Sequence, residues 1–282
     1  MNYRHAYHAG NFADVVKHAI LTRIVEYLKR KEKPFRVIDT HAGIGLYDLS
    51  SEEAQKTGEW RGGIGRLVEA SLNEKTSSLL NPLLKAVEKE NHGPGIQHYP
   101  GSPRLVRHLL RKQDRLTAIE LHPQDAARLK EIFAGDFQAR VIELDGWLAL
   151  GAHLPPKEKR GLVLIDPPFE EEGEFGRIVE KVQKAYRRWP GGIYAIWYPI
   201  KNHDSVRIFR ELFAESDIAD VIDIRLELRA PSDEPRLDGT GMIVVNSPFV
   251  LREEMEALLP VLVDILGEEG KGRWAFERLT DE

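Results

Sequence analysis

Short apolar runs alternate along the chain with longer stretches in which apolar residues recur every three or four positions. The short runs are typical of buried strands, and the longer stretches of amphipathic helices. The predicted strands are 35–38, 116–121, 139–144, 161–165, 193–197, 221–228 and 242–246. Strands that alternate with helices favour an α/β fold with a mostly parallel sheet, here of seven strands.

The segments between the strands predict the helices and one change of strand direction. Residues 12–31 are predicted to form a helix before the first strand, and residues 62–72 and 76–90 two more after it. The link between the last two strands, 229–241, is too short for a helical crossover. We therefore expect these two strands to pair antiparallel.

Composition narrows the class of protein. The chain has 282 residues, of which 42% are hydrophobic, which suits a buried core and excludes a disordered chain. No apolar run approaches the roughly 18 residues of a membrane-spanning helix, and the first residues do not resemble a secretory signal. The absence of cysteine excludes disulfides and thiolate metal sites. We expect a soluble, cytoplasmic protein that binds no membrane.

The net charge of −5 argues against a nucleic-acid partner, because phosphate contacts favour Lys and Arg. The charges are unevenly distributed, however. Residues 1–36 contain eight Lys or Arg against three Asp or Glu, and residues 104–115 contain five against one. These two clusters fit a phosphate backbone, and they fit equally well the solvated faces of ordinary helices.

The most informative motif is Asp166-Pro167-Pro168-Phe169, directly after the apolar run 161–165. A carboxylate and a proline carbonyl at a strand end can each accept a hydrogen bond from one amino group, and the Phe169 ring can stack on a base. Together they indicate methylation of an exocyclic amine of a nucleobase, with Asp166 as general base. The alternative is a strand followed by a rigid proline turn.

Three further segments follow strand ends, where ligands bind in open α/β sheets. Asp39-Thr40-His41-Ala42-Gly43-Ile44-Gly45 resembles the first cofactor loop of the class I methyltransferases. Glu120 suits an acidic residue that binds ribose, or else a carboxylate paired with Arg115. Asp145-Gly146 stands where such enzymes hold the adenine of the cofactor, although by itself it would be an ordinary turn.

Glu120 follows Asp39 by 81 residues, whereas the ribose-binding acid of dinucleotide folds follows its glycine-rich loop by about 20. The simplest explanation is an insertion after the first strand. We expect one domain over residues 1–282, with a small helical subdomain inserted at 50–98.

The histidines and Ser102 have ordinary interpretations when taken alone. His5, His8 and His18 fall close together, but their spacing does not match a usual set of metal ligands, so we expect no metal. His18 and His41 read as surface or helix-end histidines. Ser102 reads as a turn residue or a helix cap.

Nearly the whole chain resembles one family, the RlmJ-type 23S ribosomal RNA adenine-N6 methyltransferases. The matching blocks are Tyr3–Asn11, Asp14–His18, Asp39–Gly43, Tyr99–Pro103, Glu120–Pro123, Asp145-Gly146, Leu164–Pro168, Tyr194–Pro199 and Gly239–Ile243. The first block and Tyr99–Pro103 are not general features of adenosylmethionine enzymes. One departure is Phe169, where the family commonly has Tyr, so the ring for stacking is kept and the hydroxyl is absent.

The resemblance implies a class I fold with a Rossmann-like sheet and an inserted helical subdomain, acting on one adenine of 23S ribosomal RNA with S-adenosyl-L-methionine. By matching motifs it implies cofactor contacts from His18, His41, Ser102, Glu120, Asp145, Gly146 and Asp166. It implies Asp166 as the catalytic proton acceptor and Tyr3 and Phe169 on the substrate side, with His5 and Lys17 as further candidates. The expected substrate is unassembled or single-stranded RNA, and the expected enzyme is a monomer.

Two rival hypotheses remain. The Asp166 motif recognises a base and does not read the sugar, so a DNA adenine-N6 methyltransferase would carry the same pocket. A non-catalytic nucleic-acid-binding protein on the same fold is the rival outside enzymes. A glutamine methyltransferase is disfavoured, because such enzymes usually have Asn at the first position of the motif.

Overall fold

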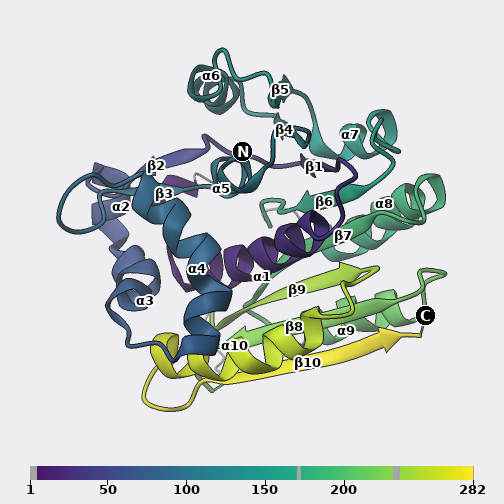
Figure 1. The fold of residues 1–282 in the computed structure, drawn as a ribbon. Helices are drawn as coiled ribbons and strands as arrows, with labels where there is room; N and C mark the ends of the chain where they lie inside the picture. Colours follow the sequence, from purple (N-terminus) through teal and green to yellow (C-terminus); the bar gives the residue numbers. More distant parts are fainter. Residues whose placement is uncertain (1–4, 170–172, 231–235, 282) are drawn as a thin grey trace.

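The computed structural model describes residues 5–169, 173–230 and 236–281, and these build an eight-stranded sheet with helices on both faces (Figure 1). The strand order is β10-β8-β9-β7-β6-β1-β4-β5. The strands are β1 (Arg36–Asp39), β4 (Arg115–Glu120), β5 (Ala139–Glu143), β6 (Gly161–Ile165), β7 (Ile193–Ile200), β8 (Val221–Glu227), β9 (Gly239–Val245) and β10 (Arg273–Thr280).

The five strands from β5 to β7 are parallel, with β1 at the centre of this half of the sheet. Asp39, the last residue of β1, lies opposite Ala118 of β4 and Leu164 of β6. The carboxyl ends of these strands therefore meet at one edge. This edge brings together the loops that the sequence singled out.

All seven predicted strands are present, and β9 pairs antiparallel with both β7 and β8, as expected for the short link before it. The expected number of strands was nevertheless wrong, because β10 adds an eighth strand antiparallel to β8. At the sheet edge none of its side chains is fully buried. Its sequence, Arg-Trp-Ala-Phe-Glu-Arg-Leu-Thr, therefore lacks the apolar run that marked the other strands.

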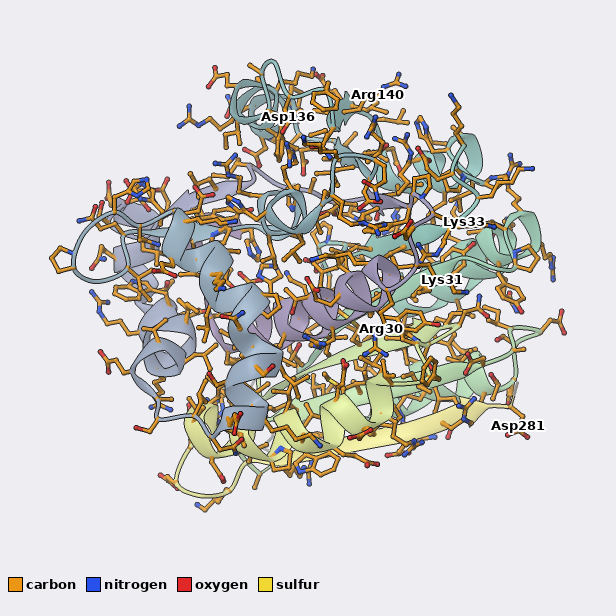
Figure 2. All side chains as sticks on the ribbon, in the orientation of Figure 1. Arg30, Lys31, Lys33, Asp136, Arg140 and Asp281 are labelled. Carbon is orange, nitrogen blue, oxygen red and sulfur yellow. The ribbon has the colours of Figure 1, made fainter. Side chains whose placement is uncertain are left out.

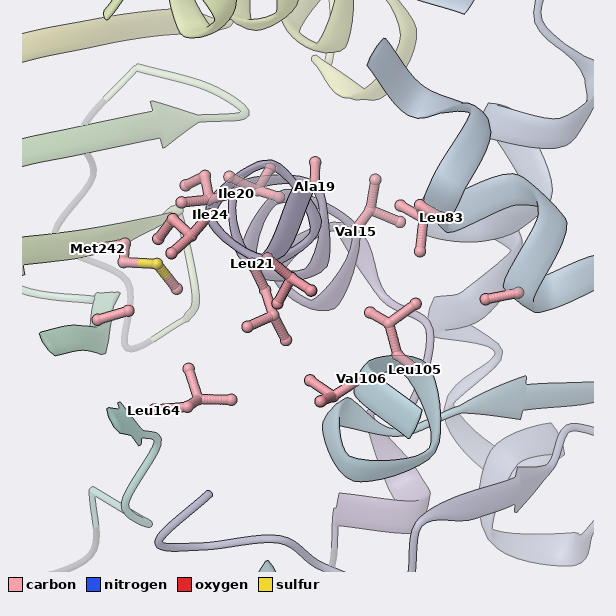
Figure 3. Packing of buried hydrophobic residues seen from close by; sticks show 14 of the residues in the cluster. Val15, Ala19, Ile20, Leu21, Ile24, Leu83, Leu105, Val106, Leu164 and Met242 are labelled. Carbon is pink, nitrogen blue, oxygen red and sulfur yellow. The ribbon is translucent and has the colours of Figure 1, made fainter. Parts of the chain in front are cut away.

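Helix α1 (Phe12–Lys29) lies at the centre of the larger hydrophobic core. Fifteen of its 18 residues are buried, which is the pattern of a helix packed on all sides. In Figure 3, Ile24 points toward Met242 of β9, Leu21 toward Leu164 of β6, and Val15 toward Leu83 of α4. The predicted helix at 12–31 is thus present and is enclosed by the fold.

The remaining helices form a layer on each face of the sheet. The face of α1 also carries α4 (Glu74–Lys89), α5 (Ser102–Leu109), α6 (Pro123–Ile132) and α10 (Leu251–Leu266). The opposite face carries α7 (Gly146–Ala152), α8 (Glu174–Arg188) and α9 (His203–Ala214), which pack in a second hydrophobic cluster. None of the helices described is both long and apolar enough to cross a membrane.

Residues between β1 and β4 form a mainly helical group. It contains α2 (Glu52–Thr57), the π-helical turn η2 (Arg61–Gly65), α3 (Arg66–Glu69) and α4, closed by a two-stranded ribbon of β2 (Leu46–Asp48) and β3 (His98–Pro100). The predicted helix 76–90 corresponds to α4. The predicted helix 62–72 is broken, because Gly63 has non-helical φ and ψ angles of −105° and −106°. A Cβ at this glycine would lie 2.2 Å from the Gly10 carbonyl oxygen, so the chain turns here to pack on the N-terminal segment.

Candidate active site

The carboxyl edge of the parallel strands borders a cavity of about 980 Å³. Its lining includes eight predicted site residues: His18, His41, Ser102, Glu120, Asp145, Gly146, Asp166 and Phe169. Asp166 thus shares one cavity with Glu120 and Asp145, although the three residues stand at or just after the ends of three different strands. Tyr3, the remaining predicted residue, lies outside the described residues.

The loop after β1 is fixed by a buried carboxylate. Asp39 is fully buried, and the Ser102 hydroxyl at the start of α5 donates to its Oδ2 at 2.6 Å. Burial raises the pKa of Asp39 to about 7, although the Ser102 hydrogen bond acts in the opposite direction. Ser102 therefore links α5 to the end of β1, and it lines the cavity at the same time.

Glu120 closes β4 and holds two loops through backbone donors. Its Oε2 accepts from the N–H of Gly43 and its Oε1 from the N–H of His122, both at 2.8 Å. Burial is the main cause of its raised pKa. An ion pair between Glu120 and Arg115 is excluded, because Arg115 stands at the opposite end of the same strand.

Gly146 lies in close contact with the first loop. A Cβ at this position would meet the Thr40 carbonyl oxygen at 2.3 Å and the His41 ring at 3.0 Å. Asp145 caps α7, since its Oδ1 accepts from the N–H groups of Trp147 at 2.6 Å and Leu148 at 3.2 Å. The Asp145-Gly146 turn is thus both a helix cap and part of the cavity wall.

Two neutral histidines line the cavity. Burial lowers the pKa of His41 to about 4 and that of His18 to about 3. His41 Nδ1 lies 2.9 Å from the Thr40 hydroxyl, which itself donates to the Leu164 carbonyl. The Thr40 oxygen must therefore accept from Nδ1–H, which leaves His41 Nε2 as a hydrogen-bond acceptor.

His18 has one polar atom that the protein does not satisfy. Its Nδ1 is 2.8 Å from the Tyr99 hydroxyl, and the two rings stack with centroids 5.5 Å apart. Its Nε2 is buried and has no hydrogen-bond partner among the described residues. Because buried polar groups are nearly always hydrogen-bonded, a water or a ligand atom next to this nitrogen would complete its hydrogen bonding.

Asp166 belongs to a buried charge network that joins β6 to α1. Lys17 Nζ donates to Asp166 Oδ2 at 2.6 Å and lies 2.7 Å from Asp14 Oδ1. Asp14 Oδ2 is 2.9 Å from His5 Nε2. Burial alone would raise the pKa of Asp14, but the charges of His5 and Lys17 hold it well below its usual value. The two carboxylates in turn raise the pKa of Lys17, against the effect of burial.

An aromatic wall stands beside Asp166. Phe169 is half-buried, with its ring 5.3 Å from that of Phe175 and 5.7 Å from that of Trp197. The Trp197 indole donates to Thr240 Oγ1 at 2.7 Å, which fixes the ring. Phe169 and Trp197 both line the cavity, so apolar faces lie next to the acceptors.

Sequence reasoning named His5 and Lys17 through the resemblance but missed Asp14, Tyr99 and Trp197 as parts of the site. A signal was present for Trp197, an aromatic residue near the carboxyl end of a predicted strand. Tyr99 contacts His18, which is 81 positions away in the sequence. Asp14 contacts Lys17 within a buried helix. No local sequence pattern marks either contact. Among the described residues no group of three His, Asp or Glu side chains is placed to hold a metal ion.

The strand order, with acidic side chains and close-packed glycines around a cavity at the carboxyl edge, defines a class I methyltransferase fold. The chain belongs to the family described as ribosomal RNA large subunit methyltransferase D, RlmJ, whose model matches residues 32–280.

Known proteins resemble the chain over its whole length. It is 42% identical to the ribosomal RNA large subunit methyltransferase J of Haemophilus influenzae and 40% identical to that of Escherichia coli, each over 100% of both chains. A crystal structure of a protein from Legionella pneumophila is 33% identical, with a TM-score of 0.88, over 96% of this chain and 98% of that one.

Proposed function

We propose that the chain transfers a methyl group from S-adenosyl-L-methionine to N6 of an adenine in 23S ribosomal RNA. The observation that carries the proposal is the position of Asp166 and Pro167 at the end of β6, in one cavity with Glu120 and the loop after β1. Membership of the family and the names of the two curated relatives support the same activity.

The residues around the first loop fit the cofactor. Gly146 brings the backbone of one loop close to another, and the Glu120 carboxylate lines the same cavity, where it would accept hydrogen bonds from ribose hydroxyls. The orphaned His18 Nε2 and the acceptor His41 Nε2 offer polar contacts without charge. A cavity of about 980 Å³ is at the upper end of the range for ligand sites, roughly 300–1,000 Å³, so a cofactor and a base can share it.

When bound, S-adenosyl-L-methionine would supply an electrophilic methyl group, and loss of that group from the sulfonium would leave a neutral thioether. The amine of adenine is a poor nucleophile, because its lone pair is delocalised into the ring. The protein would therefore have to make this amine nucleophilic. Asp166 and the Pro167 carbonyl would accept the two amine hydrogens and so localise the pair on N6. As N6 gains the methyl group, Asp166 would take the proton that the amine loses.

The Lys17 ammonium fixes one oxygen of Asp166, and Phe169 fixes the plane of the base. Stacking on an aromatic ring contributes about 1–3 kcal/mol per base, and it does not require the hydroxyl that Tyr would provide. An adenine within a duplex would have to leave the stack to reach this wall, so unpaired RNA is the favoured substrate.

We also propose that residues 50–98 form an inserted subdomain that completes the cavity. Gly58, Glu59, Gly62 and Arg66 from this segment all line it. A subdomain at the rim can contact RNA around the target adenine. We expect the enzyme to act as a cytoplasmic monomer.

Methyl transfer to deproteinised 23S ribosomal RNA, compared with duplex DNA of mixed sequence, tests the substrate class. Incorporation of label into RNA as N6-methyladenine is the expected result. Preferential methylation of DNA would favour the DNA methyltransferase instead. Calorimetry addresses the non-catalytic rival, since a protein that does not bind S-adenosyl-L-methionine at millimolar concentration cannot be this enzyme.

Asp166→Ala tests the mechanism. General acid–base contributions are typically 10²- to 10⁴-fold, so we expect turnover to fall by about 10³-fold or more. Cofactor affinity should change little, because Glu120 and the first loop remain. Asp166→Asn, which keeps the volume of the side chain, is the control for folding. Near-normal turnover in either variant would contradict the assigned role.

A further inference from the structure

Four loops meet at the amino edge of the parallel strands, opposite the cavity. Residues 30–35, 110–114, 133–138 and 153–160 lead into β1, β4, β5 and β6, which are neighbours in the sheet. Arg36, the first residue of β1, lies opposite Arg115 of β4 and Gly161 of β6. The loops therefore form one continuous end of the molecule.

This end concentrates positive charge in a protein whose net charge is −5. We call it the amino-edge surface and define it by Lys31, Lys33, Lys112, Arg115, Phe137, Arg140, Lys157, Lys159 and Arg160. None of its eight cations lies within 4 Å of a carboxylate in the described part of the chain. Figure 2 labels Lys31 and Lys33, near the loop between α1 and β1, and Arg140 on β5.

The acids of these loops are mostly engaged by other arginines. Asp114 pairs with Arg111 at 2.8 Å, Glu158 with Arg36 at 2.8 Å, and Asp136 with Arg107. In these loops Glu32 is the one acid that forms no ion pair with a described residue. The eight cations of the amino-edge surface are thus left with little compensating charge.

Hydrogen bonds to main-chain carbonyls hold the loops together without cancelling their charge. Arg160 Nη1 donates to the Lys33 carbonyl at 3.0 Å, Arg115 Nη1 to the Lys112 carbonyl at 2.9 Å, and Arg111 Nη1 to the Lys31 carbonyl at 2.9 Å. Burial and the nearby charge of Arg111 lower the pKa of Arg160. Like charges are therefore held close to one another in a fixed arrangement.

An exposed aromatic ring stands among these cations. Phe137 is 75% exposed, and the Arg115 guanidinium lies 5.5 Å from its ring centroid. Exposed rings beside Lys and Arg are the combination that binds bases and phosphates of RNA together. RNA would account for both features together, since its phosphates can pair with the cations and its bases can stack on the ring.

We propose that the amino-edge surface is a second contact site for the RNA substrate, separate from the cavity. This inference rests on the proposed function, which makes RNA the partner. The two edges are separated by the length of β6, five residues or roughly 17 Å, plus the loops. A long structured RNA reaches both edges, whereas a short oligonucleotide in the cavity reaches one.

The test removes three exposed cations, in the combined variant Lys31→Gln, Lys33→Gln and Lys112→Gln. Affinity is measured over a range of salt concentrations, without S-adenosyl-L-methionine, for deproteinised 23S ribosomal RNA and for a short oligonucleotide with one unpaired adenine. The matched control is Lys130→Gln, Lys184→Gln and Lys271→Gln, which removes three exposed lysines elsewhere. Phe137→Leu is tested separately.

Each phosphate contact contributes about 0.7–0.9 to the slope of log affinity against log salt, so the slope for long RNA should fall by about 2 in the triple variant. Its affinity for long RNA should fall about tenfold or more at moderate salt, and its affinity for the oligonucleotide should not change. Phe137→Leu should weaken long-RNA binding about fivefold or more with the slope unchanged.

Three results would overturn the inference: an equal loss in the control variant, an equal loss for long and short RNA, or competition by polyglutamate as strong as by polyuridylate of equal length. The last would mean a site for any polyanion. Because no methyl transfer is measured, a failure of the proposed reaction would not produce any of these outcomes.

Discussion

Replacing Lys17 by Met measures how much the buried charge network stabilises the fold. Lys17 is 4% exposed and its ammonium lies between two carboxylates, of which Asp14 keeps donors from His5 and the Gly10 N–H. Asp166 loses the Lys17 bond at 2.6 Å. Removing one partner of a buried ion pair costs about 3–5 kcal/mol, because the other charge stays buried.

That cost can be expressed as a shift of the unfolding midpoint. With an unfolding entropy of about 2.1 cal/mol/K per residue, a chain of 282 residues loses about 5 °C for a destabilisation of about 3 kcal/mol. The raised pKa of Lys17 gives stability that is present below its unfolded value of 10.5. The lowered pKa of Asp14 gives stability that is present above its unfolded value of 3.8. Both contributions are therefore complete at pH 7, where calorimetric scans should be run.

The matched control is Lys29→Met on the same helix. Lys29 pairs with Glu26 at 2.6 Å, but both side chains are about a quarter exposed, so the cost should stay below about 1 kcal/mol. Adding Asp166→Asn to Lys17→Met removes the unpaired charge and should recover part of the loss. Equal midpoints for Lys17→Met and Lys29→Met would refute the reasoning, as would a double variant that recovers nothing.

Three further changes test other parts of the site. Burial raises the pKa of Asp39 from 3.8 in the unfolded chain to about 7, so between these values the unfolded chain has released a proton that the folded chain still holds, and stability falls as pH rises. Asp39→Asn has no such proton and should match the wild type near pH 4 and be more stable above pH 7. Thermal scans in which the difference between the two does not change with pH would refute this. Gly146→Ala should weaken cofactor binding in calorimetry, since its Cβ would meet the Thr40 carbonyl oxygen at 2.3 Å; unchanged affinity would mean that the loops can separate freely. Phe169→Ala should raise KM for RNA about fivefold or more and leave cofactor affinity intact, and equal losses of both would contradict stacking.

Much of the fold was predictable because buried parallel strands consist of short runs of apolar residues. β6, Gly-Leu-Val-Leu-Ile, is buried throughout and was found at its observed bounds. The edge strand β10 has no such run, because solvent covers much of it and polar residues are tolerated there. The helix broken at Gly63 was missed for another reason. Its break depends on the close approach of Gly10, a tertiary contact that no local pattern encodes.

The same distinction applies to the site. Asp166, Glu120 and Asp145 were predictable because each stands at or just after the end of a strand, and parallel strands bring their carboxyl ends to one edge. Asp14 could not be predicted in the same way. It pairs with Lys17 within a helix whose sequence looks like that of an ordinary core helix. Lys17 entered through the resemblance alone. Its contact with Asp166 joins residues 149 positions apart, so only the folded chain reveals it.

The position of α1 explains how a buried helix can serve the chemistry. Packing on all sides fixes the rotation of the helix, so Lys17 and His18, adjacent in sequence, are both held at the cavity. Lys17 reaches the carboxylate proposed to act on the base, and His18 lines the same cavity. A flexible segment could supply the same side chains, but it would lose entropy on each binding event. Because Lys17 and His18 belong to a buried helix, their conformational entropy is already lost when the protein folds, and binding does not have to lose it again.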